Sequence, residues 1–501
     1  RVVMTREMLN LQWEQVLLYP AGYYASRIQV QANLQLPKGW QQASALRVEK
    51  AQSASTTFKP VSLETLVDSP IFAGAHFKRF ELDGPNSKRP VTLNLVADSA
   101  KLLEVGDDQI SAHRKLVEQA DKLYGSRHFE HYDFLLSLTE HMSGIGLEHH
   151  QSSENGVRPN YFKDWSKQIG ARGLLPHEYT HSWNGKFRRP ADLWTANYNE
   201  PMQNSLLWLY EGQTQYWGRV LTARSGLATT EQSIDQLAQV AATYAHRSGR
   251  LWRNLQDTTN EMTMSGRRQE KDWGGWQRGA DYYDEAALMW LDADTLIRKE
   301  SKGKRSLDHF AHAFFGVNDG QVAPRTYTFD EVITELNKVW PYDWRAFLRS
   351  RLDGHAKAPL DGIKRGGYEL TWADKPSEFD RNAQQDNPRG SESSTDFSYS
   401  LGLSVTKGGK LQQVMWGGPA FNAGLSGSMH LIAVNQRAYK PELLSEAIAG
   451  NKDGKAPLEL LVKDEDHYRT VVVDYREGLR YPRLTRVQGQ DDLLSEVFKA
   501  R

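Results

Sequence analysis

The sequence contains no cysteine. Disulfides and thiolate chemistry are therefore excluded, and any bound metal must rely on nitrogen and oxygen donors. Net charge is also absent, because Lys+Arg and Asp+Glu both number 62, and this balance argues against a protein that wraps nucleic acid. The sequence has no apolar run of 18 or more residues, so we expect no membrane span. The lack of cysteine is typical of a bacterial periplasmic or secreted protein, which is the location we expect.

No signal peptide is visible, and the sequence opens at Arg1 without an initiator Met. We expect the numbering to begin downstream of the true N-terminus, with any targeting segment preceding it. The 501 residues include 39% hydrophobic and 25% charged side chains. This globular composition and length predict about three domains.

Residue patterns divide the protein into five regions. Alternation of polar and apolar side chains over Arg27–Leu36 is typical of a half-buried strand. Helical patterns follow at Asp107–Tyr124 and Leu206–Leu221, with a strand-like Phe134–Met142 between them. We therefore predict a multidomain α+β protein with a β-sandwich-like domain at 1–98, an α/β and helical domain at 99–375, a polar linker at 376–397, a small domain at 398–480 and a tail at 481–501.

The segment His177-Glu178-Tyr179-Thr180-His181 carries the first candidate site. Residues i and i+4 of a helix share one face, so both imidazoles can reach one ion. Glu178 projects from an adjacent position, where it can activate an attacking water without being a ligand. The alternative is a pair of histidines on a solvated or internally satisfied helix face.

A catalytic zinc takes three protein ligands and keeps one open position. Glu211 follows the strongly apolar run 206–210, and a carboxylate in such surroundings is costly to bury without a cation or partner. We predict that His177, His181 and Glu211 hold one Zn²⁺ ion. A glutamate at the boundary of an amphipathic helix is the alternative.

These motifs resemble the M61 glycyl aminopeptidase family, a branch of the gluzincin peptidases. HEYTHSWNGKFRRP and LYEGQTQYWG resemble its metal helix and third-ligand helix. GIGLEHHQS resembles its Gly-Gly-Leu-Glu-His element, although Ile145 separates the two glycines. The resemblance implies that this element binds substrate, with Glu148 on the free α-amino group; its residues here are Gly144, Gly146, Leu147, Glu148 and His149.

Downstream, the segment that begins at Asp281 resembles the part of the family that carries a catalytic tyrosine. The family usually has Tyr-Tyr-x-Lys-Gly, whereas Glu285 and Ala286 stand here. By position Tyr283 would donate a hydrogen bond to the tetrahedral oxyanion, with Tyr282 as the alternative. Simple helix packing would also account for either ring.

The resemblance implies a thermolysin-like catalytic domain, preceded by the β domain and followed by a PDZ domain at 398–480. The loop at Leu401-Gly402-Leu403 resembles the PDZ carboxylate-binding loop, whose neighbouring strand edge can accept a peptide or the C-terminus of a protein. A PDZ fold that only clamps the catalytic domain is equally compatible with these residues.

We therefore predict a zinc aminopeptidase that acts on peptides, with a preference for N-terminal Gly or Ala that rests on the family name alone. Two alternatives stay open. One is an endopeptidase that uses the same zinc site, and the other is a PDZ-based peptide-binding protein with a vestigial metal site.

Overall fold

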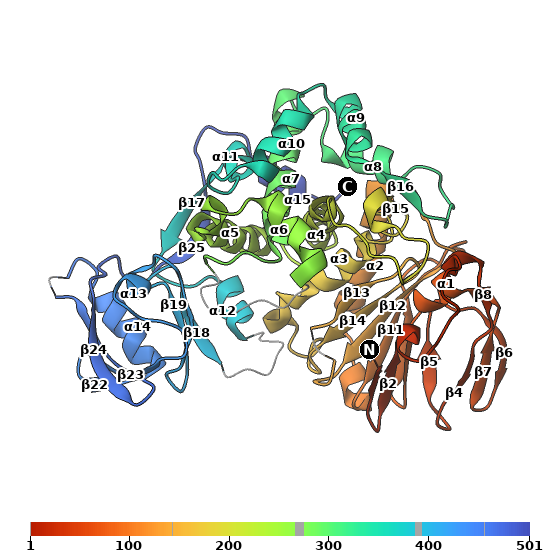
Figure 1. The fold of residues 1–501 in the computed structure, drawn as a ribbon, viewed down its shortest axis with the longest axis horizontal. Helices are drawn as coiled ribbons and strands as arrows, with labels where there is room; N and C mark the ends of the chain where they lie inside the picture. The colour runs from red at the N-terminus through yellow and green to blue at the C-terminus, as the bar shows by residue number, and fades with distance from the viewer. Residues whose placement is uncertain (1, 143, 266–274, 386–392, 455) are drawn as a thin grey trace. The chain divides into compact units, whose positions relative to one another are not determined.

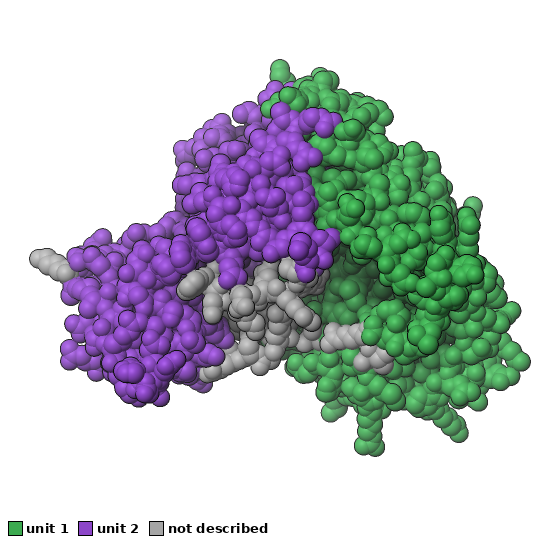
Figure 2. All heavy atoms as spheres, in the orientation of Figure 1, with its two compact units in different colours: residues 1–229, 301–344, 498–501 green, residues 230–300, 345–497 purple. Residues whose placement is uncertain are grey.

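The computed structural model describes residues 2–142, 144–265, 275–385, 393–454 and 456–501. They form two compact units, coloured separately in Figure 2. Unit 1 consists of 1–229, 301–344 and 498–501, and unit 2 consists of 230–300 and 345–497. Figure 1 labels many of the helices and strands of both units.

Unit 1 begins with short antiparallel strands. One sheet has the strand order β1 (Val2–Met4), β2 (Met8–Leu11), β9 (Ile71–Gly74), β5 (Gln41–Ala43). A second sheet has the order β4 (Asn33–Gln35), β7 (Ser55–Phe58), β6 (Val48–Gln52). A separate pair, β3 (Gln29–Val30) and β8 (Val61–Ser62), precedes helix α1 (Leu63–Val67). Trp13, Phe58 and Leu63 are among the side chains of their shared core.

The strand predicted over Arg27–Leu36 is divided in the structure. β3 and β4 belong to different sheets, and the two residues between them lie outside both strands. Alternation describes which side chains are buried but not which strand is the partner, so two short strands keep the same pattern as one long strand.

A five-stranded sheet follows in unit 1. Its order is β10 (Phe77–Glu81), β11 (Val91–Ala97), β12 (Tyr132–Leu138), β14 (Ser152–Val157), β13 (Gly146–Glu148). The three central strands run parallel, and the two edge strands are antiparallel to their neighbours. Every residue of β12 and β14 is buried, as expected for parallel strands covered on both faces.

Helix α2 (Asp107–Tyr124) connects β11 to β12 and coincides with the helix predicted from the sequence. Unit 1 also contains a parallel strand pair and four further helices: β15 (Arg188–Pro190), β16 (Arg325–Tyr327), α3 (Leu174–Thr180), α4 (Leu207–Arg224), α8 (Leu307–Phe315) and α9 (Phe329–Val339). Helix α3 packs against α4 and also contacts β13 and β14. These contacts bring two helices and the edge of the sheet to one place.

Unit 2 combines a mainly helical part with a small β-rich module. The helical part contains α5 (Thr230–His246), α6 (Leu255–Ser265), α7 (Asp281–Glu300), α10 (Trp344–Asp353, whose first residue belongs to unit 1), α11 (Asp361–Arg365), α12 (Glu378–Gln385) and the antiparallel pair β17 (Tyr368–Ala373) and β25 (Tyr481–Arg486). Helix α15 (Leu493–Phe498) follows β25.

The small module has an apolar core of its own, which includes Leu403, Leu431 and Leu460. It contains a three-stranded sheet, a four-stranded sheet and two helices: β18 (Ser394–Phe397), β19 (Leu403–Thr406), β20 (Leu411–Val414); β22 (Arg437–Ala438), β21 (His430–Val434), β23 (Leu458–Asp464), β24 (His467–Val473); α13 (Pro419–Asn422) and α14 (Pro441–Gly450).

Three predicted boundaries differ from this architecture. The boundary at residue 98 falls inside the five-stranded sheet, because β11 pairs with β12. The predicted linker 376–397 contains α12 and β18, apart from 386–392, which lie outside the described residues. The predicted tail 481–501 contains β25 and α15. The boundaries depend on strand pairing between segments that lie far apart in the sequence. Local composition gives no information about such pairing.

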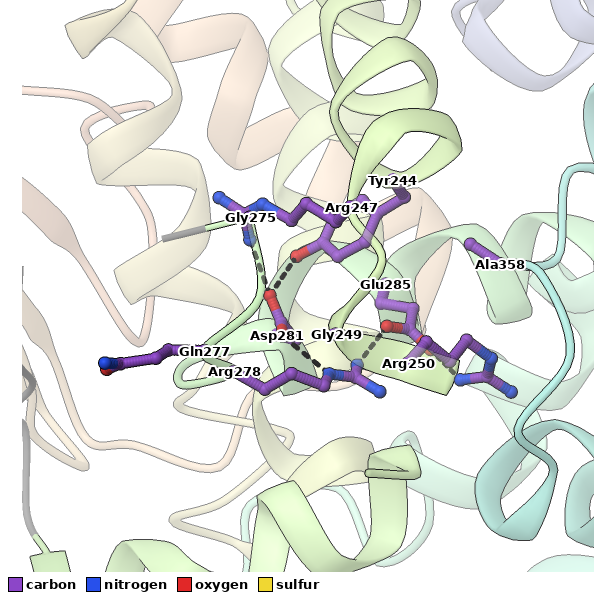
Figure 3. A pocket seen from close by; sticks show the side chains of 10 residues that line it. All are labelled: Tyr244, Arg247, Gly249, Arg250, Gly275, Gln277, Arg278, Asp281, Glu285 and Ala358. Carbon is purple, nitrogen blue, oxygen red and sulfur yellow. Dashed lines mark hydrogen bonds and ion pairs between the residues drawn. The ribbon is translucent and has the colours of Figure 1, made fainter. Parts of the chain in front are cut away.

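A buried cluster of charged side chains surrounds the first turns of α7 in unit 2 (Figure 3). Glu285 contacts the guanidinium groups of both Arg250 and Arg278. Arg278 Nε also lies 2.9 Å from Asp281, and Arg247 lies 2.7 Å from the same carboxylate. The resemblance to the M61 family places Lys at the position of Glu285, and the cluster pairs two carboxylates with three arginines.

Among the described residues, no helix combines the length and apolar character that a bilayer span requires.

Candidate metal centre

Three ligand atoms meet in unit 1, from α3, from the residue that directly follows α3 and from α4. His177 Nε2 and His181 Nε2 lie 3.2 Å apart, and Glu211 Oε2 lies 3.5 Å from the first and 3.3 Å from the second. Ligand atoms about 2.0–2.2 Å from a zinc ion at tetrahedral angles lie about 3.3–3.6 Å from one another. The triangle therefore has the size that one zinc ion requires.

Close helix packing forms this triangle. His177 lies in α3 and His181 directly follows it, while Glu211 lies one turn into α4. A side chain at Gly218 of α4 would place its Cβ 3.0 Å from the Cα of His177. Glycine at this position allows the two helix backbones to approach.

The tautomer of His181 suits metal binding. Its Nδ1 lies 2.9 Å from the carbonyl oxygen of Asn184, which can only accept, so Nδ1 carries the proton. The lone pair of Nε2 is then directed toward the triangle, and the hydrogen bond holds the ring in place. The amide nitrogen of Asn184 in turn donates to the carbonyl oxygens of Leu209 and Tyr210 in α4, which ties the two ligand segments together.

Electrostatics around Glu211 also favour a cation. Its side chain is largely buried, and burial alone would raise the pKa of the carboxyl group. The neighbouring His181 and His177 outweigh burial and hold the pKa of Glu211 well below its usual value. Glu211 is thus an ionised ligand, as zinc binding requires.

Glu178 lies beside the triangle with one carboxylate oxygen unused. Its Oε2 is buried and has no hydrogen-bond partner among the described residues. Burial is the main influence on its pKa, and although His177 opposes it, the Glu148 and Glu211 carboxylates reinforce it, so the pKa rises to about 8. A buried carboxylate with a raised pKa and a spare oxygen has the properties of a general base.

The predicted substrate element reaches the same place on β13. One oxygen each from Glu148 and Glu178 and a ring nitrogen of His181 lie within 4.8 Å of one another. A Cβ at Gly146 would come 2.3 Å from Glu178 Oε1, which accounts for glycine there. Leu147 is half-buried, and Gly144 precedes the strand with a φ of +72°.

Tyr210 is a site residue that sequence reasoning missed. Its hydroxyl donates to Glu148 Oε1 at 2.6 Å, and its ring centroid lies 4.8 Å from that of His181. A Cβ at Gly185 would approach this ring to 2.5 Å, and the φ of +123° there also favours glycine. The only local signal for Tyr210 was its position directly before Glu211.

The predicted catalytic tyrosine lies in α7, which belongs to unit 2. Tyr282 is only 2% exposed, whereas Tyr283 is half-buried, and their ring centroids lie 5.0 Å apart. In unit 1 the structure brings His177, His181, Glu211, Glu178 and Glu148 together, whereas the ring of His149 lies against Asp68 and Glu154. The role of Tyr283 stays a prediction.

Solved structures match the protein to different extents. An aminopeptidase N family protein from Idiomarina loihiensis matches with a TM-score of 0.79 at 19% identity, over 99% of this protein and 83% of that one. An M1 zinc metallopeptidase variant from Deinococcus radiodurans, bound to a Tyr-Ser-Ala substrate, matches with a TM-score of 0.43 at 15% identity, over 66% and 65%. No curated protein matches. The first likeness shows a shared fold.

Two family models match the sequence itself. Residues 1–75 match the N-terminal domain of the M61 peptidases, and residues 170–289 match the M61 glycyl aminopeptidase model. The second match includes all three residues of the triangle. The protein therefore matches the M61 glycyl aminopeptidase family in two segments, its β-rich N-terminal domain and its helical catalytic domain, and its His177, His181 and Glu211 form a zinc metallopeptidase-like site.

Proposed function

We propose that this protein is an aminopeptidase that uses one zinc ion to remove N-terminal residues from peptides. The observation that carries the proposal is the triangle of His177, His181 and Glu211 with two further carboxylates beside it. Its sides of 3.2–3.5 Å suit one zinc ion. Bound there, zinc would act as a Lewis acid that polarises the scissile carbonyl and acidifies water.

The two carboxylates have separate tasks in this proposal. Glu178 takes a proton from the attacking water and passes it to the leaving amine. Glu148 binds the α-ammonium group of the substrate, and Tyr210 donates to its Oε1. His181 and Lys186 help to hold the pKa of Glu148 below its usual value against the effect of burial. An ionised Glu148 is the form that attracts a cationic amine.

Tyr283 is the residue that we propose as donor to the oxyanion. Its side chain is half-buried, whereas that of Tyr282 is buried, and only an accessible hydroxyl can meet a substrate. The preference for small N-terminal residues, Gly or Ala, is a proposal that rests on the family.

Free-amine substrates should be strongly preferred. We expect kcat/KM for an alanyl chromogenic substrate to exceed that of its N-acetyl analogue by at least about 100-fold, because the analogue leaves the buried Glu148 without its cationic partner. A panel of Gly, Ala, Leu and Phe substrates measures side-chain preference, and chelation followed by zinc addition tests metal dependence. Equal cleavage of blocked peptides would favour the endopeptidase alternative. Activity that survives complete zinc removal would contradict the metal site.

We also propose that residues 398–480 form a PDZ module that acts as a clamp rather than capturing peptides. Two features support this. β19 pairs with β18 on one edge and with β20 on the other, so the edge that an added strand would use is taken. The N–H of Gly402, in the loop that would hold a carboxylate, donates to the carbonyl oxygen of Phe397.

If the module acts as a clamp, we expect it not to bind peptides through a terminal carboxylate. Fluorescence anisotropy with labelled peptides that end in a free carboxylate should show no binding to the full-length protein beyond that of their amidated counterparts. Carboxylate-dependent binding would instead assign the module to peptide capture.

A further inference from the structure

The imidazole of His149 lies between two carboxylates. Its Nδ1 is 3.1 Å from Asp68 Oδ1, and its Nε2 is 3.0 Å from Glu154 Oε1. Ionised carboxylates only accept hydrogen bonds, so both ring nitrogens must donate. His149 is therefore an imidazolium. Its two carboxylate partners outweigh burial and raise its pKa to about 9.

Both partners are fixed by other groups. Asp68 Oδ1 lies 2.8 Å from Lys186 Nζ, and Asp68 Oδ2 accepts the backbone N–H of His150 at 2.8 Å. Glu154 is completely buried and accepts from the side-chain amides of Asn10 and Gln12 at 2.5 and 2.9 Å. Two acids and two bases thus form a charge-balanced network, anchored in part by the N-terminal domain.

The network acts on a weakly supported strand. β13 is an edge strand whose backbone pairs only with β14 among the described residues. It ends at Glu148, and His149 begins the turn, where its N–H donates to the carbonyl oxygen of Ser152. Because His149 directly follows Glu148 at the end of β13, fixing the His149 ring restrains the backbone that directs the Glu148 side chain.

We propose that His149 is a positioning residue for the amine-binding Glu148, and that Asp68 of the N-terminal domain holds it in that role. The inference rests on the proposed aminopeptidase function. In this arrangement His149 does not bind substrate itself, because both ring nitrogens are engaged by carboxylates. The N-terminal domain thereby contributes to recognition of the substrate amine.

His149 and Asp68 form one ion pair, and steady-state kinetics of His149→Gln and Asp68→Asn test the positioning role by changing each partner in turn. We expect KM for an alanyl substrate to rise about tenfold in each, because a displaced anchor weakens amine binding, while kcat changes less and zinc content stays at the wild-type level. In a Glu148→Gln background, His149→Gln should add no further increase in KM, because the anchor is already lost.

His131 supplies the matched control. It is also a buried histidine with one nitrogen on a carboxylate, Asp133 at 2.7 Å, and the other on the N-terminal domain, the carbonyl oxygen of Ala45 at 3.1 Å. It precedes β12, away from Glu148 in the sheet order. His131→Gln should leave KM unchanged.

Three outcomes would count against the inference. A wild-type KM in Glu148→Gln would overturn amine anchoring and this inference together. An impaired Glu148→Gln with normal KM in both His149→Gln and Asp68→Asn would overturn the positioning role alone. Additive effects of His149→Gln and Glu148→Gln would show that His149 acts by another route.

Discussion

Replacement of Glu178 by Gln should lower kcat by roughly 10²–10⁴-fold while zinc stays bound, because the new residue keeps its size but can no longer take a proton. Glu178 is not part of the His177, His181 and Glu211 triangle, so its charge is not needed to complete the ligand set. Its Oε1 lies against Gly146, where a Cβ would come within 2.3 Å, and an amide of the same size fits this space. Turnover of an alanyl substrate and metal content, measured on the same preparation, check both parts.

Metal content separates two interpretations of the site. The oxygens of Glu148 and Glu178 and a nitrogen of His181 form a second group within 4.8 Å. If Glu178 were a ligand rather than a base, Glu178→Gln would lose zinc together with activity. Glu118→Gln, at an exposed position of α2, is the control and should be unaffected in both. Unchanged turnover in Glu178→Gln would remove Glu178 from the mechanism.

Local patterns in the sequence predicted those parts of the protein that depend on one helix or one spacing. Helix α2 has the predicted bounds, because its apolar periodicity and following Gly125 are local signals. The pairing of His177 with His181 follows from helical geometry in the same way. Glu211 was accessible to sequence reasoning because a lone carboxylate in an apolar run needs a cation or a partner.

Contacts between distant segments could not be predicted from these patterns. Tyr210 meets Glu148 across 62 residues, and Asp68 meets His149 across 81. Each residue taken alone suits an ordinary surface or core position. The continuation of the sheet from β11 to β12 across residue 98 has the same origin. Only the assembled fold shows that Asp68 of the N-terminal domain contacts His149, the residue that follows Glu148.

The charged cluster on α7 gives the largest expected effect on stability. Burial raises the pKa of the Glu285 carboxyl, while the Arg278 and Arg250 guanidinium groups oppose this shift. The side chains of both arginines are at most 6% exposed. Glu285→Ala removes the carboxylate that pairs with Arg250 and leaves Arg278 with Asp281 alone, which should cost about 3–5 kcal/mol of unfolding free energy. Urea denaturation followed by tryptophan fluorescence measures this loss.

Glu285→Lys is the more informative change, because it restores the residue type that the family usually carries. A third cation would then face Arg250 and Arg278, and we expect unfolding at lower urea than for Glu285→Ala. Glu285→Gln keeps an acceptor for both guanidinium groups and should be the mildest of the three. Glu300→Ala, at the exposed end of α7, is the control and should match the wild type. If Glu285→Lys were as stable as the wild type, the two arginines could not depend on this carboxylate, and the lysine of the family would be compatible with the same surroundings.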